Sequence, residues 1–172
     1  MLRLIPAPLH RAALRVGHRL RIAWWRWRRP QIEGASIIVC DDRGHVLLIR
    51  QTYGAGRWAL PGGGLRRGER PEHGAARELA EELGCRATTL RRLTVTDGTL
   101  HGAPSRVHLF AARIDGEPRP DGREIEVARF YPRDALPDLL DARVSSWLAL
   151  LRADASPSAR RPDGPTDQSS RS

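Results

Sequence analysis

The sequence predicts an α/β domain, and three observations support this class. The chain has 172 residues, enough for one domain with a substantial core. Apolar stretches bounded by turn residues predict strands from about residue 35 onward. Residues 71–84 carry the start and stop signals of a helix with one apolar face. The sequence contains no apolar run long enough to span a bilayer.

The strand pattern is clearest in ASIIVCDDRGHVLLIRQTYGAGRWALPGGG, which covers residues 35–64. It predicts a strand, an Asp-Arg-Gly turn, a second strand, a loop and a short strand that runs into the glycines. The stretch from Pro61 to Gly64 can turn sharply and bring bare backbone close to a ligand. A glycine-rich turn before a helix is a weak signal when it is taken alone.

The next element is a helix with two recognisable ends. Pro71 suits the first helical position, where its missing N–H would have no partner, and Gly84 suits the position just past the end. Between them, four apolar residues fall within about 100° of arc on a helical wheel. This predicted core-facing stripe consists of Ala76, Leu79, Ala80 and Leu83.

Three carboxylates gather on the other side of this helix, at Glu78, Glu81 and Glu82. One interpretation is a solvated acidic face. The other is a metal site. Glu78 and Glu82 repel each other, and Arg77 is expected to point about 100° away from Glu78, so a bound cation would explain why the carboxylates lie together. Several oxygen ligands suit Mg²⁺ or Mn²⁺. With the free N–H groups of the helix start nearby, the pattern indicates a phosphate held beside metal ions.

These residues together resemble the Nudix box. Gly63 is followed after five residues by Glu69, and after seven more by Arg77 and the run that ends at Cys85. Two positions depart from the common form: Cys85 replaces an aliphatic residue, and Arg70 stands where a small capping residue often precedes the helix. The resemblance extends over residues 34–152 and implies an α/β/α sandwich with a mixed β-sheet. It assigns 105–114 and 125–137 to later strands and a following loop.

The resemblance implies hydrolysis of a nucleoside diphosphate linked to another group. Carried over by position, Glu78, Glu81 and Glu82 hold Mg²⁺, with Mn²⁺ as the alternative, and the Gly62 carbonyl is a further ligand. Arg77 orients the carboxylates and Glu69 braces the loop. The residues expected to be catalytic are Glu78, Arg77, Glu82 and the later Glu124.

Two roles in this expected site stay open. The general base is Glu78 or Glu124, which lies just before a late strand but is otherwise an ordinary acid in DGREIE. The expected substrate contacts are residues that flank or form the glycine turn, namely Arg50, Tyr53, Gly63 and Gly64. Trp58 flanks the same turn and is equally compatible with a place in the core.

The substrate itself is not indicated. The family's markers for ADP-ribose and for dinucleoside polyphosphates, a proline and a tyrosine downstream of the box, are replaced by Leu100 and Gly102. Two rival functions therefore remain: hydrolysis of pyrophosphate from RNA 5′ ends, and ligand sensing without catalysis. The retained metal glutamates favour turnover over sensing.

The chain divides into a basic amphipathic helix (1–33), the hydrolase domain (34–152) and a disordered polar tail (153–172). Residues 1–30 hold eight arginines and no acid, so they supply +8 of the net charge of +9. The apolar stripe of this predicted helix is Leu9, Ala13, Val16, Leu20, Trp24 and Trp27. Three interpretations stay open: a helix docked on the domain, an anchor on an anionic membrane surface, and an RNA-binding segment.

The two cysteines, Cys40 and Cys85, are too few for a disulfide framework. Both lie in apolar surroundings and are expected to be buried thiols of a protein in a reducing compartment. The expected location is therefore the cytoplasm, with peripheral membrane association if the basic helix binds lipid.

Overall fold

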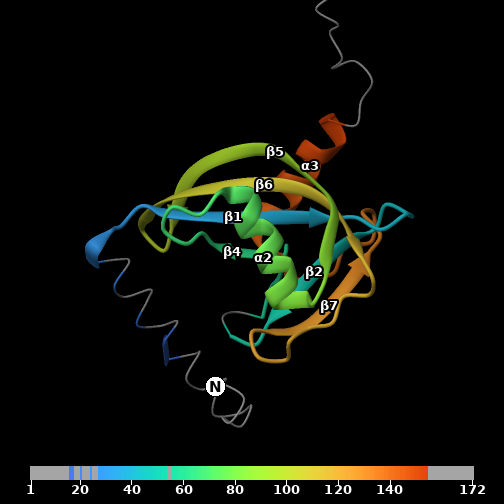
Figure 1. Cartoon of the computed structure of the whole chain (residues 1–172), viewed down its shortest axis with the longest axis horizontal. Coiled ribbons are helices and arrows are strands. Elements are labelled where there is room, and N and C mark those ends of the chain that lie inside the picture. The colour runs from blue at the N-terminus through green and yellow to red at the C-terminus, as the bar shows by residue number, and fades with distance from the viewer. Residues whose placement is uncertain (1–15, 18–19, 21–23, 25–26, 54–55, 155–172) are drawn as a thin grey trace, which may run out of the picture.

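A computed structural model describes residues 16–17, 20, 24, 27–53 and 56–154. The described chain forms seven strands and the two helices α2 and α3, whose arrangement is drawn in Figure 1. The strands are β1 (Ile32–Val39), β2 (Val46–Gln51), β3 (Trp58–Ala59), β4 (Gly62–Gly64), β5 (Arg86–Leu100), β6 (Ala103–Asp115) and β7 (Ile125–Tyr131). The helices are α2 (Pro71–Leu83) and α3 (Ala142–Asp154).

The strands form two sheets, one with four strands in the order β4-β1-β6-β5 and one with three in the order β3-β2-β7. In the larger sheet β1 runs parallel to β6, and the other two pairings are antiparallel. The predicted mixed sheet is confirmed, and the structure adds a smaller antiparallel sheet that the sequence did not indicate.

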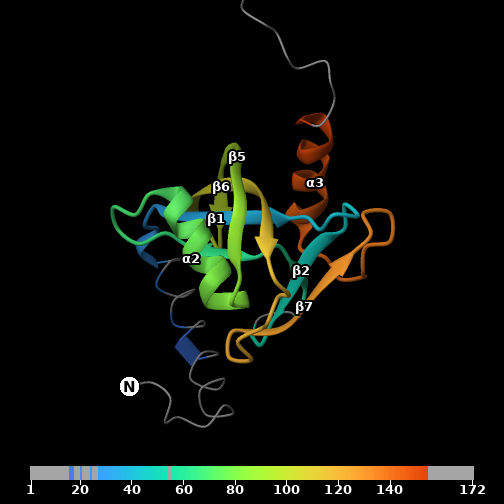
Figure 2. The ribbon, with the colours of Figure 1, turned by 45° about the vertical axis from the view of Figure 1, so that its right-hand side comes forward.

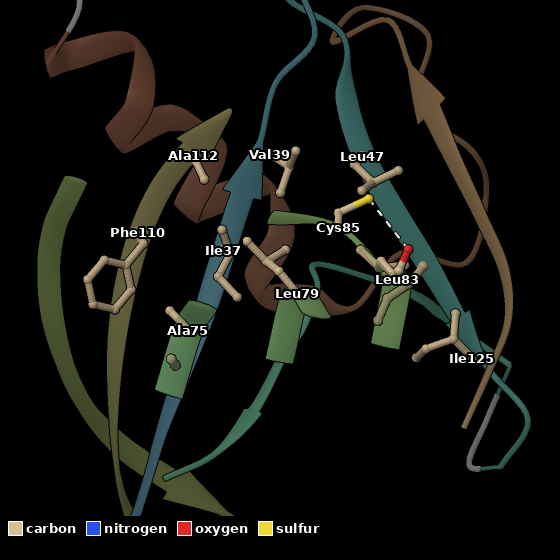
Figure 3. Close-up of a cluster of buried hydrophobic side chains, with 12 residues drawn as sticks. Ile37, Val39, Leu47, Ala75, Leu79, Leu83, Cys85, Phe110, Ala112 and Ile125 are labelled. Atoms are coloured by element: carbon tan, nitrogen blue, oxygen red, sulfur yellow. Dashed lines mark hydrogen bonds between the residues drawn. The ribbon is translucent and has the colours of Figure 1, made fainter. Parts of the chain in front are cut away.

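The helices cover opposite sides of β1 (Figure 2). Helix α2 buries Leu79 and Leu83 against alternate residues of β1 such as Ile37 (Figure 3). Helix α3 packs its buried residues, among them Val144, into a second cluster with Ile38, the neighbour of Ile37 on β1. Successive side chains of a strand point to opposite faces, which is why β1 contributes to both clusters.

Both predicted ends of the box helix are confirmed. Helix α2 begins at Pro71, and Gly84 terminates it in the left-handed conformation with a φ of 64°. The predicted apolar stripe is only half right, because Leu79 and Leu83 are buried while Ala76 and Ala80 are exposed. The helix is turned so that its buried face also includes Glu82.

The strands expected in residues 35–64 are confirmed, and so are the strands expected in 105–114 and 125–137. Strand β1 begins at Ile32, two residues inside the segment assigned to the N-terminal helix. Strand β5 and helix α3 were not predicted. Cys85 is buried as expected and its thiol donates to the Leu83 carbonyl, whereas Cys40 is only half-buried (Figure 3).

Most of the predicted N-terminal helix lies outside the described residues, and so does the tail from residue 155 onward. The described members of its apolar stripe are helical and exposed: Val16, Leu20, Trp24 and Trp27 are 57%, 66%, 49% and 78% accessible. Because these four side chains are exposed, they do not dock the segment on the domain, as one of the three interpretations expected. Within the described chain, no helix has the length and apolar character needed to cross a membrane.

Candidate active site

The glycine strand β4 places bare backbone beside β1, where Gly62 pairs with Ser36 and Gly63 with Ala35. Gly62 has a φ of 137°, and a β-carbon there would lie 2.1 Å from the Ala35 carbonyl oxygen. Only glycine fits this position, because both the backbone angle and the space exclude a side chain. The strand therefore comes close enough to β1 and α2 to form one wall of a cleft.

The cleft has a volume of about 480 Å³ and gathers residues from distant parts of the chain. Its walls include the three glycines of β4, the three carboxylates of α2, Tyr53, Glu124 and Arg143. The structure thus brings together most of the site residues expected from the sequence. It also adds Arg143 and Gln51, neither of which was predicted from the sequence.

Arg77 is the hub of the carboxylate cluster. Its guanidinium donates to Glu69 from Nε at 2.8 Å, to Glu78 from Nη1 at 2.7 Å and to Glu81 from Nη1 at 2.9 Å. The expectation that Arg77 points away and leaves the carboxylates without a cation is therefore wrong. The Arg77 side chain is long enough to reach across the helix surface to these carboxylates.

Glu69 fixes the loop before α2. One of its oxygens accepts the Arg66 backbone N–H at 2.8 Å, and both accept from the Arg77 guanidinium. The hydrogen bond from Arg77 and that from the Arg66 backbone lower the pKa of Glu69 to about 2. These contacts match the bracing role expected for Glu69, although the role itself stays a prediction.

Glu82 is the most enclosed carboxylate, with 6% of its surface accessible. Its Oε2 atom accepts the Gly62 N–H at 3.1 Å. In the protein without a cation, burial raises the pKa of Glu82 to about 8, and the charges of Glu78 and Glu124 add to the shift. Burial likewise raises the pKa of Glu78, while Arg77 opposes that change. A positive charge beside these two groups would therefore be strongly favoured.

The residues fit a hard divalent cation in donor type. Every candidate ligand supplies oxygen, and the cleft lining includes Glu78, Glu81, Glu82 and Gly62. Among the described residues, however, no three acidic, histidine or cysteine side chains are arranged as a ready metal site. Arg77 pairs with one oxygen of Glu78 and with one oxygen of Glu81, so part of this carboxylate set is already engaged by a guanidinium.

Glu124 reaches the same cleft from the start of β7. Asp121 holds its backbone: one Asp121 oxygen accepts the N–H groups of Arg123, Glu124 and Ile125 at 2.9–3.0 Å. The Asp-Gly pair at 121–122 is a turn signal that could have identified Asp121. Glu124 is therefore placed near the box carboxylates by a well-defined loop, as its predicted role requires.

The expected substrate contacts separate into two groups. Tyr53, Gly63 and Gly64 line the cleft. Arg50 instead pairs with Glu126 at 3.3 Å and lies over the Trp58 ring, and it is not among the described residues of the lining. Trp58 is half-buried and packs against the second core cluster, as the core interpretation predicts.

A substitution of Gly63 tests how closely β4 fits the carboxylates. A β-carbon there would lie 2.6 Å from Glu78 Oε1, so Gly63→Ala should displace this carboxylate. Because the flexible end of a side chain can move, we expect the free energy of unfolding to change by less than about 1 kcal/mol. Hydrolysis should fall by roughly 10- to 100-fold in a steady-state assay.

Gly64→Ala is the matched control, since its β-carbon would meet only the Glu33 carbonyl oxygen, at 4.0 Å. Neither glycine has a positive φ, so the backbone tolerates alanine at both positions. Equal losses of hydrolysis in the two variants would show that β4 itself, and not its contact with Glu78, is sensitive.

A family model described as NUDIX domain matches residues 30–151. A curated RNA pyrophosphohydrolase of Saccharophagus degradans is 39% identical over 72 residues, which are 42% of this chain and 41% of the relative. The RNA pyrophosphohydrolase of Pectobacterium atrosepticum is 40% identical over 68 residues, 40% of this chain and 36% of the relative. The chain thus spans about two fifths of the length of these curated relatives.

The solved structures agree on the fold. A MutT Nudix hydrolase from Burkholderia pseudomallei has a TM-score of 0.65 and 28% identity, and the match covers 71% of this chain and 98% of that one. A MutT protein from Methanosarcina mazei has the same TM-score at 20% identity, covering 74% and 98% of the two chains. The second likeness concerns the fold alone.

Proposed function

Because the chain belongs to the Nudix family, we propose that it is a metal-dependent hydrolase of phosphoanhydride bonds. Its substrate class is a nucleoside diphosphate linked to another group. The observation that carries the proposal is the buried Glu82, which shares one cleft with Glu78, Glu124 and the glycine strand. Nudix hydrolases use divalent metal ions, and the all-oxygen donor set favours Mg²⁺, with Mn²⁺ as the alternative.

In this proposal the box glutamates Glu78, Glu81 and Glu82 hold the metal with the Gly62 carbonyl. A metal held there would offset charge on the phosphoryl oxygens and lower the pKa of a bound water. Arg77 and Glu69 fix the loop and the helix relative to each other through their paired contacts. Glu78 or Glu124 accepts a proton from the water whose oxygen attacks phosphorus, and the anhydride P–O bond breaks.

A panel assay tests the activity. The full chain is incubated with Mg²⁺ or Mn²⁺ and with nucleotide sugars, dinucleotides, oxidised deoxynucleoside triphosphates and 5′-triphosphorylated RNA. Turnover of at least one class is expected, and its loss in EDTA would identify the metal requirement. Tight binding of a panel member with no turnover would instead support the alternative of a ligand-sensing domain.

RNA 5′-end pyrophosphohydrolysis is the second candidate. Two observations favour it: the curated relatives named above carry this activity in their names, and residues 1–30 hold eight arginines without an acid. Arginines bind the phosphates of a nucleic acid, and exposed tryptophans such as Trp24 and Trp27 can stack on bases. The basic segment would then hold the RNA while the cleft acts on its 5′ end.

Removal of residues 1–30 distinguishes binding from chemistry. Since β1 begins at Ile32, a chain that starts at Gln31 should fold and hydrolyse a small diphosphate substrate with a similar kcat. If the segment binds RNA, the full chain should lose affinity for a 5′-triphosphorylated oligonucleotide by on the order of 10³-fold between about 50 and 200 mM salt. The shortened chain should bind weakly at both concentrations, as measured by fluorescence anisotropy.

Two other outcomes contradict the RNA proposal. Equal RNA binding by both chains would leave the basic segment without this role. Binding to anionic vesicles by the full chain alone would assign the segment to a membrane surface, with the exposed Trp24 and Trp27 in the lipid interface. Whether residues 1–30 bind RNA or a membrane surface, the proposed location of the protein is the cytoplasm, in line with the free thiols of Cys40 and Cys85.

A further inference from the structure

Arg143 brings a positive charge into the cleft from an unexpected element. It lies in the first turn of α3, whereas the box carboxylates come from α2 on the other side of β1 (Figure 2). The two helices are about 60 residues apart in the sequence, yet Arg143, Glu78 and Glu82 line one cleft. The cleft lining therefore includes the glutamates of α2 and an arginine of α3.

The Arg143 guanidinium is fixed by its own neighbours. Its Nε atom donates to Asp141 Oδ1 at 3.0 Å and its Nη2 atom to Oδ2 at 3.3 Å. Its Cζ atom lies 5.1 Å from the centre of the Trp147 ring, which is itself buried in the second core cluster. Asp141 binds one edge of the guanidinium, and the Arg143 side chain is 48% accessible. A planar cation held in this way is prepared to bind an anion at its remaining edge.

A diphosphate in this cleft needs a cation beside it, because the lining is rich in carboxylates. A diphosphate carries several negative charges, and the described lining already includes five glutamates: Glu33, Glu78, Glu81, Glu82 and Glu124. Arg77, which pairs with the box carboxylates, is not in the described lining. Arg106 lines the cleft, but Asp97 binds it at two nitrogen atoms. Arg143 differs from Arg106 because it is also stacked on a core residue.

We propose that Arg143 of α3 binds a phosphoryl group of the substrate in the cleft, with Asp141 and Trp147 holding its guanidinium in place. The ligand class is a diphosphate, of which one phosphoryl group lies at the carboxylates and the other at Arg143. Guanidinium groups suit this task because they form paired, charge-assisted hydrogen bonds with phosphate oxygens. The inference rests on the proposed hydrolase function and names a binding residue for it.

Methylenediphosphonate with Mg²⁺ is a suitable probe, because it resists hydrolysis and has no nucleoside. Calorimetry of the full chain should show binding, and Arg143→Gln should weaken it by about 10-fold or more, the effect of losing a charged hydrogen-bond pair. Arg143→Lys should recover part of the affinity. With any substrate that the wild type hydrolyses, Arg143→Gln should raise KM by a similar factor and leave kcat within about threefold.

Arg113→Gln is the matched control. Arg113 is 49% accessible, pairs with Asp42, and does not belong to the described lining of the cleft. This variant loses the same charge and should bind the probe like the wild type. Equal weakening in both variants would reveal a nonspecific effect of net charge and would overturn the proposal.

Three further results would overturn it: no binding of the probe by the wild type, affinity within twofold in Arg143→Gln, or a loss of kcat with unchanged KM. The last result would assign Arg143 a purely structural role in α3, next to its cap at Asp141. Failure of the parent proposal has a different signature, since the wild type would then hydrolyse no member of the substrate panel.

Discussion

Glu82→Gln should lower kcat by on the order of 10³-fold in saturating Mg²⁺ while the metal-free protein stays folded. The expected loss corresponds to a few kcal/mol of charge stabilisation from a metal that is no longer held correctly. Glutamine keeps the shape of the side chain, and its carbonyl oxygen can still accept the Gly62 N–H. Steady-state rates with any substrate from the panel measure the effect.

The stability of this variant gives an independent readout. Glu82 is 6% accessible, and among the described contacts it has a backbone N–H but no cation as a partner. Because burial raises the pKa of Glu82 to about 8, ionising this side chain in the folded protein is unfavourable, and a neutral glutamine should leave the metal-free midpoint of thermal unfolding unchanged or raise it. Added Mg²⁺ should raise the midpoint of the wild type more than that of Glu82→Gln, because a ligand stabilises only the state that binds it.

Glu72→Gln provides the control on the same helix. Glu72 lies in the first turn of α2, pairs with Arg92 and is not among the described residues of the cleft. It should retain wild-type turnover and the wild-type response to Mg²⁺. Full activity of Glu82→Gln in saturating Mg²⁺ would remove Glu82 from the proposed metal site.

The ends of α2 could be predicted from the sequence because they depend on local backbone chemistry. Proline at the first position and a glycine with a φ of 64° after the last one specify these ends with little help from the rest of the fold. These ends were predicted from single residues and are confirmed. The glycines were expected to form a sharp turn, but Gly62–Gly64 forms strand β4, in which Gly62 adopts a φ of 137° against Ala35.

The rotation of α2 about its axis could not be obtained in the same way. Alanines occur on both sides of Leu79, so apolar character alone does not choose between Ala75 and Ala76. The sheet makes the choice: Ala75 is buried, Ala76 is exposed, and Glu82 turns inward toward Gly62. A tertiary contact between α2 and β4 thus decided which residues the helix buries.

The two elements that were missed have different causes. Strand β5 is 15 residues long, and its pairing with β6 shifts register between Ala87 and Thr89 and again between Arg92 and Thr94. Such irregularities interrupt the alternation by which a strand is recognised. Helix α3 could have been found, because its buried residues recur at helical spacing: Val144, Trp147, Leu148 and Leu151.

Arg77→Gln should be the most destabilising change at the site. The substitution leaves Glu69 and Glu78, whose side chains are each 13% accessible, without the guanidinium that pairs with them. Loss of one partner of an enclosed ion-pair network costs about 3 kcal/mol, the lower end of the range for buried pairs. For a chain of this size that corresponds to a fall of roughly 6–12 °C in the midpoint of thermal unfolding. Arg77 also bonds to the Gly64 carbonyl at 3.1 Å, so the loop before α2 should loosen as well.

Arg66→Gln separates this effect from the loss of any arginine near the box. Arg66 is 67% accessible and its side chain pairs with the exposed Glu81 at 3.0 Å, so the expected change is less than about 1 kcal/mol. Arg77→Lys should fall between wild type and Arg77→Gln, because an ammonium group keeps the charge but cannot bridge several carboxylates at once. Equal midpoints for the variants at 66 and 77 would mean that solvent and the neighbouring arginines replace Arg77. In that case the enclosed hub would contribute to orientation of the carboxylates and not to stability.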